Sequence, residues 1–184
     1  HLNGMINLII GERQSGKTQK LVEKAIELFL QGKKVGVVFP NWSHGFPNRC
    51  ISYLLTNKIH YEYSKGAQQH QIFSYTHGGS ITFFKPDSFL IPGSALYINR
   101  DINCWILEEW EPYSNLKLEI FDNVYISGNY DVLKYFVTNK INHSVEFVKR
   151  KKQNFTREEV LDLIQENRPL WQILDRNYLD NNSI

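Results

Sequence analysis

The chain has 184 residues, of which 42% are hydrophobic and 14% aromatic, and its formal charge is +2. This length suits one domain with a small appendage, and the apolar fraction excludes an intrinsically disordered chain. The balanced charge does not mark a nucleic-acid binder, and no apolar stretch predicts a signal peptide or a membrane span. Cys50 and Cys104 lie too far apart in sequence for a metal-ligand pair or a disulfide scaffold, so we expect a soluble, cytoplasmic protein.

In chain order, the first predicted elements are a strand, a loop, a helix and a second strand. An apolar strand is predicted over 5–10, and an amphipathic helix over 17–31 ends at Gly32. A second apolar strand is predicted over 33–39. This strand–helix–strand order predicts a parallel sheet. The four residues ahead of Met5 are interpreted as a cloning remnant and are left out of the fold.

The following elements are shorter. A helix is predicted over 49–56. Strands are predicted over 71–75, 80–84, 103–108, 123–127 and 144–148, the first two forming a hairpin. A capping box from Thr156 to Glu159 predicts a helix to about residue 165. The expected fold is an α/β three-layer domain over 5–150 with a mostly parallel central sheet, followed by a helical appendage over 151–184.

Residues 11–18 carry the strongest motif of the chain. They read Gly-Glu-Arg-Gln-Ser-Gly-Lys-Thr, a full match to the phosphate-binding pattern G-x-x-x-x-G-K-[ST] between a strand and a helix. Backbone amides and the helix N-terminus would hold phosphates, Lys17 would reach the β- and γ-phosphates, and Thr18 would ligate Mg²⁺. The sequence therefore predicts binding of ATP with Mg²⁺. The expected binding residues are Gly11, Glu12, Arg13, Gln14, Ser15, Gly16, Lys17 and Thr18.

The predicted strand over 103–108 delivers two consecutive carboxylates to its C-terminal end. In an open parallel sheet this end faces the ligand crevice. Glu108 would support Mg²⁺, mostly through water, and Glu109 would orient or deprotonate the attacking water. Consecutive strand residues point to opposite faces, so both can serve one site only where the strand bends. The alternative is a strand that ends in solvated acids.

Other candidates carry weaker signals. Ser127 and Asn129, after a further strand, are candidate sensors of the γ-phosphate, and an ordinary strand-to-helix turn is the alternative. Arg13 and Arg100 are candidates to stabilise transition-state charge, in cis or across a subunit boundary, and surface arginines are the alternative.

Within the phosphate loop, the segment from Arg13 to Thr18 resembles the R-Q-x-G-K-[ST] form found in the large terminase subunits of tailed bacteriophages. The later order is also similar over about 5–137: a strand that ends at Pro40, the acidic strand, and Val124-Tyr-Ile-Ser-Gly128 ahead of Tyr135-Phe136. The resemblance implies an ATPase of the additional-strand, catalytic-Glu class that moves double-stranded DNA into a viral shell in the host cytoplasm. It also implies a homo-oligomeric ring, viral portal or shell partners, and an arginine supplied to the nucleotide.

Several features depart from that family. Glu108 stands where an Asp is usual, and the chain has no length for the nuclease domain that such subunits carry, so an isolated ATPase domain or a compact packaging ATPase is expected. The basic run 149–152 would contact DNA phosphates or form a solvated surface.

Two other functional hypotheses are alternatives to the terminase hypothesis. The loop and the strand ending at Pro40 also resemble tetrameric-type thymidine kinases, which however carry a cysteine-rich zinc lobe. The third hypothesis is a regulatory, DNA-binding module that binds nucleotide without turnover. In such a module the aromatic segment 60–84 would stack on bases, and the alternative is that it forms the core of the hairpin.

Overall fold

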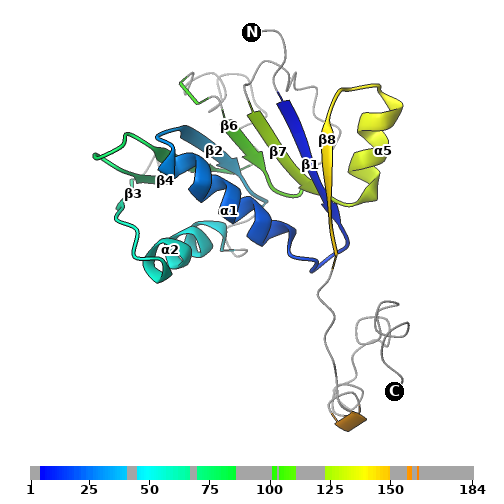
Figure 1. Cartoon of the computed structure of the whole chain (residues 1–184), viewed down its shortest axis with the longest axis horizontal. Helices are drawn as coiled ribbons and strands as arrows, with labels where there is room; N and C mark the ends of the chain where they lie inside the picture. The colour runs from blue at the N-terminus through cyan, green and yellow to red at the C-terminus, as the bar shows by residue number, and fades with distance from the viewer. Residues whose placement is uncertain are drawn as a thin grey trace. The chain divides into compact units, whose positions relative to one another are not determined.

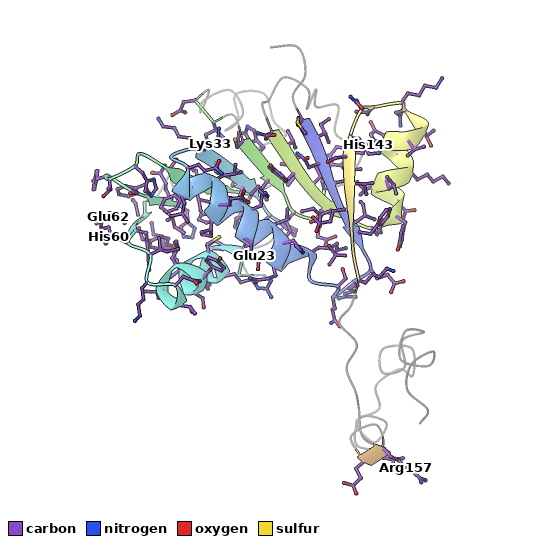
Figure 2. All side chains as sticks on the ribbon, in the orientation of Figure 1. Glu23, Lys33, His60, Glu62, His143 and Arg157 are labelled. Atoms are coloured by element: carbon purple, nitrogen blue, oxygen red, sulfur yellow. The ribbon has the colours of Figure 1, made fainter. Side chains whose placement is uncertain are left out.

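The structure is a computed structural model that describes residues 5–40, 45–66, 70–85, 101–102, 104–110, 123–149, 157–158 and 161. The chain divides into two compact units, His1–Lys149 and Arg150–Ile184. In the second unit, Arg157, Glu158 and Leu161 are helical, and the rest of the predicted appendage lies outside the described residues (Figure 2). The first unit contains all the elements discussed below.

A single sheet forms the middle of the first unit (Figure 1). Its strands are β1 (Met5–Gly11), β2 (Lys34–Val38), β3 (Glu62–Lys65), β4 (His70–Phe73), β5 (Ser80–Phe84), β6 (Cys104–Leu107), β7 (Asn123–Gly128) and β8 (Ser144–Val148). Within the described residues the sheet has eight strands in the order β3-β4-β5-β2-β6-β7-β1-β8. The two pairings that involve β4 are antiparallel, and all the others are parallel.

The helices are α1 (Lys17–Leu30), α2 (Phe46–Thr56) and α5 (Tyr130–Thr138), and they cover both faces of the sheet (Figure 1). Alternate residues of β1 show this: Ile9 packs with α1 and α2, whereas Leu8 and Ile10 pack with α5. The opposite side of α1 is polar, with Glu23 exposed on it (Figure 2). Three layers result, because each face of a two-sided sheet needs an apolar cover. The predicted α/β fold with a mostly parallel sheet is confirmed.

Two strands separate β1 from β2, although a single helix connects them in sequence. The acidic strand β6 pairs with β2, and β7 lies between β6 and β1. β7 is thus an additional strand between the phosphate-loop strand and the acidic strand. Among the described strands, this order leaves the C-terminal ends of six parallel neighbours, from β5 to β8, at one edge of the sheet, where a ligand crevice is expected.

Some boundaries differ from those predicted, for local reasons. α2 begins at Phe46, three residues before the predicted start, because Gly45 takes a left-handed conformation with φ 68° and Pro47 suits a first helical turn. β4 ends at Phe73, because the Ser74 hydroxyl accepts hydrogen bonds from the backbone N–H groups of Thr76 and His77 and starts a turn. β3 and α5 lie outside the predicted set. Within the described residues, no helix is long and apolar enough to cross a membrane.

Candidate functional site

The phosphate loop connects the C-terminal end of β1 to the first residue of α1. Two of its residues have positive φ: Gln14 at 62° and Gly16, the N-cap of α1, at 96°. A Cβ atom on Gly11 would lie 2.5 Å from both the Ser15 Oγ atom and the Val148 carbonyl oxygen. The first glycine of the motif is therefore required by close packing, and the second by its backbone conformation.

Lys17 is buried, and its ammonium group lies at the phosphate loop. Its Nζ atom donates a hydrogen bond of 2.8 Å to the carbonyl oxygen of Gly11 and lies 3.6 Å from Glu109 Oε1. The Ser15 hydroxyl is also buried, and in the described part of the chain it has no hydrogen-bond partner. An ammonium group and an unsatisfied hydroxyl facing a glycine-rich turn are groups that a phosphate can satisfy.

Thr18 and Glu108 face each other across this site. The Thr18 hydroxyl donates a 2.9 Å hydrogen bond to Glu108 Oε1, and Glu108 is buried. The backbone N–H of Glu108 also donates to the Val38 carbonyl at 2.9 Å, which extends the β2–β6 ladder by one residue. The Glu108 side chain thus reaches the threonine of the phosphate loop.

These two oxygens fit a magnesium ion. Hydroxyl and carboxylate oxygens are ligands that Mg²⁺ accepts, and the ion commonly takes its remaining ligands from nucleotide phosphates and water. Among the described residues, no three histidine, cysteine, aspartate or glutamate side chains are close enough to hold a metal on their own.

Glu109 has the left-handed backbone conformation, with φ 51°. This turn carries its carboxylate to Lys17, while the preceding Glu108 reaches Thr18. Two consecutive residues of a straight strand would point to opposite faces. The bend after β6 is what brings both carboxylates to the phosphate loop.

The tip of β7 holds this bend in place. The buried Ser127 hydroxyl accepts a 2.9 Å hydrogen bond from the backbone N–H of Glu109, and the Ser127 carbonyl accepts one of 3.3 Å from Trp110. The Asn129 side chain instead accepts a 2.9 Å hydrogen bond from the backbone N–H of Asp131 and caps α5. Asn129 thus makes the ordinary strand-to-helix cap, and the sensing roles of both residues stay predictions.

A pocket of about 320 Å³ lies over the loop. It is lined by Arg13, Gln14, Ser15, Gly16, Lys17, Thr18, Arg49 and Glu109. Arg13 thus lines this pocket, and its role in stabilising transition-state charge stays a prediction. Arg100 lies outside the described residues. Arg49 was not among the sequence candidates, because an arginine in the first turns of a helix has no motif of its own. The only available signal was its place after β2, whose C-terminal end adjoins the acidic strand.

Cys50, next to Arg49, is buried behind the site. Burial raises the pKa of its thiol, and the negative charge of Glu108 raises it further. The thiol therefore stays protonated and is not a nucleophile of the site.

Comparisons with known proteins identify the fold. No protein-family model and no curated protein matches the chain. A structure of the large terminase from a thermophilic bacteriophage matches with a TM-score of 0.56 at 9% identity, covering 92% of this chain and 46% of that one. The same terminase in complex with ADP matches with a TM-score of 0.55 at 10% identity and the same coverage.

A third match is the large terminase ATPase domain of Thermus phage P74-26, with a TM-score of 0.39, 16% identity, and coverage of 81% of this chain and 61% of that one. The chain spans less than half the length of the first terminase. The expected resemblance is confirmed at the level of the fold: this chain has the α/β fold that large terminases contain.

Proposed function

We propose that this chain is a magnesium-dependent ATPase of the terminase type. The observation that carries the proposal is the pairing of the two functional side chains of the phosphate loop with the two carboxylates that follow β6. Lys17 pairs with Glu109 and Thr18 pairs with Glu108, across 92 and 90 positions of sequence respectively. A Gly-rich turn without nucleotide function would not require this convergence.

The Lys17–Glu109 ion pair suggests how binding prepares the reaction. An incoming phosphate chain competes for the Lys17 ammonium, because phosphate carries more negative charge than one carboxylate. The half-exposed Glu109 carboxylate is then released toward a water molecule beside the γ-phosphate. That water attacks the phosphorus, its proton passes to Glu109, and the bond to the leaving oxygen breaks to give ADP and inorganic phosphate.

Thr18 and Glu108 would hold the magnesium ion in this scheme. When bound, the ion neutralises phosphate charge. The hydrogen bond between the two side chains places both oxygens together before the nucleotide arrives, so little rearrangement is needed.

We further propose that hydrolysis drives the movement of double-stranded DNA in viral genome packaging. This step is supported by the form of the phosphate loop and by the likeness of the fold to large terminases. The expected assembly is a homo-oligomeric ring that works with viral portal or shell proteins. The chain spans less than half of the thermophilic-phage terminase. We therefore propose that it supplies the ATPase unit of such a motor and not the whole terminase.

The test is phosphate release from ATP by the purified chain, with Lys17→Ala as the blank. It is run over a range of protein concentrations, alone, with duplex DNA, and with thymidine. Turnover that DNA stimulates more strongly at higher protein concentration supports a ring-forming translocase. Thymidine-dependent consumption of ATP would replace the proposal by a kinase. A chain that fails to bind nucleotide in equilibrium titration would contradict the proposal at its first step.

A further inference from the structure

The position of Arg49 is set by the packing of α2. Phe46, Cys50 and Leu54, spaced four residues apart, are buried in the core that α2 shares with α1. This stripe determines the rotation of the helix about its axis. Arg49 precedes Cys50, and its backbone N–H donates a 2.8 Å hydrogen bond to the Gly45 carbonyl, so it lies in the first ordered turn. The side chain is exposed to solvent and lines the phosphate pocket.

The charges around this pocket favour an anion. Among the described residues that line it are three cationic side chains, Arg13, Lys17 and Arg49, and one carboxylate, that of Glu109. That carboxylate already pairs with Lys17. In the described part of the chain, the Arg49 guanidinium makes no hydrogen bond or ion pair with another side chain. Its charge is therefore available to a ligand.

We propose that Arg49 contacts the γ-phosphate of the bound nucleotide from the same subunit. This inference rests on the proposed function and names a specificity residue of the same site. The loop amides and the N-terminus of α1 surround the phosphates from one side. Arg49 belongs to a different element and shares the pocket with Glu109, the residue expected beside the attacking water. A planar guanidinium can form two parallel hydrogen bonds with a phosphate, which suits the γ-phosphate at the exposed end of the nucleotide.

This contact would distinguish ATP from ADP. ADP keeps the phosphates held by the loop but lacks the group that Arg49 would bind. Recognition of the triphosphate would then depend on α2 as well as on the loop. A change in the packing of α2 against α1 would therefore change the affinity for ATP.

The experiment measures equilibrium binding of ADP and of a non-hydrolysable ATP analogue, each with Mg²⁺, to the full chain and to three variants. In Arg49→Ala we expect the affinity for the triphosphate analogue to fall at least tenfold and that for ADP to change less than twofold. Arg49→Lys should recover part of the loss, because the charge remains but the paired geometry does not. Lys65→Ala removes an exposed positive charge of β3 that does not line the phosphate pocket and should match the parent chain. Far-ultraviolet circular dichroism and thermal melting verify that each variant is folded.

Equal losses for both nucleotides, or no loss for either, would overturn the assignment of Arg49. Such a result would leave the ATPase proposal standing as long as Lys17→Ala still abolishes turnover. If the parent chain binds neither nucleotide, the proposed function fails and this inference fails with it. The two failures are therefore distinguishable in one set of titrations.

Discussion

At the scale of single residues, the site depends on Glu109, whose backbone is strained and whose side chain is placed by that strain. A left-handed conformation costs a residue with a Cβ atom roughly 1–2 kcal/mol. The cost is tolerated because the Ser127 hydroxyl and carbonyl both accept hydrogen bonds from this turn, at 2.9 Å from Glu109 and 3.3 Å from Trp110. Strain held by its surroundings is typical of functional sites.

Replacing Glu109 by Gln should separate binding from turnover. Gln keeps the size of the side chain but cannot accept the proton of the attacking water, so we expect turnover to fall by a factor of about 10²–10⁴. Binding of ATP should persist, because Lys17 is released from its ion pair rather than lost. Phosphate release and nucleotide titration measure the two effects. Wild-type turnover in this variant would contradict the role of Glu109 as the base.

Replacing Ser127 by Ala should disturb the position of Glu109. The backbone N–H of Glu109 would lose its acceptor, and we expect a loss of about 1–3 kcal/mol of folding free energy. Because the carboxylate would be less well positioned, kcat should fall by about tenfold with KM nearly unchanged. Urea denaturation and steady-state kinetics check these effects. A loss of stability with unchanged kcat would give Ser127 a structural role only.

At the scale of elements, the site is made by strands that are distant in sequence and adjacent in the sheet. β2 and β6 pair in parallel register, with Gly36 opposite Trp105. A Cβ atom on Gly36 would come within 2.5 Å of the Trp105 Cε3 atom. The glycine therefore makes room for the buried indole ring, and this contact helps to seat β6 so that its last residues reach the phosphate loop.

Replacing Gly36 by Ala should destabilise the sheet. We expect a cost of about 1–3 kcal/mol, because the Trp105 ring must move within a packed core. Urea denaturation measures the cost. The matched test is the same change in a Trp105→Phe background, where the smaller ring leaves space and the cost should be less. Equal costs in both backgrounds would mean that the indole is not the obstacle.

At the scale of the whole molecule, two apolar clusters lie on opposite faces of one sheet. The cluster with α1 and α2 contains both cysteines of the chain, Cys50 and Cys104, and both are free thiols. A reagent can therefore reach either thiol only when the helices α1 and α2 separate from the sheet or from each other. Burial and the nearby Glu108 charge raise the pKa of Cys50, which keeps it in the unreactive protonated form.

Thiol labelling should report this opening. We expect a disulfide reagent to react only slowly with either cysteine in the native chain at neutral pH and rapidly with both in denaturant. Bound nucleotide should slow native labelling further, because it stabilises only the folded state. Mass spectrometry counts the labelled thiols. Rapid labelling of Cys50 in the native chain would show that α2 separates readily from α1, and it would weaken the argument that α2 holds Arg49 in place.

Much of the fold followed from local patterns. The strands around Leu8, Val37, Ile106 and Ile126 are apolar runs, and the stripe of α1 includes Leu21, Ala25 and Phe29, so periodicity alone located them. β3 is a short edge strand with mostly exposed residues, so it had no distinct signal. α5 did have one, because Asn129 caps it, but in the sequence that residue supported only the alternative of a strand-to-helix turn. The phosphate loop was readable because its function depends on consecutive residues.

By itself, the sequence determined that a strand, a glycine-rich turn and a helix make a phosphate-binding loop, and that a strand ends in two acids. Only the tertiary structure decided how these parts meet. The left-handed turn at Glu109, the hydrogen bond that its backbone N–H donates to the β7 tip and the approach of Arg49 from α2 all depend on strand order, which links residues far apart in the chain. Such contacts leave no periodic trace, because their partners are chosen by the packing of the sheet and not by neighbours in sequence.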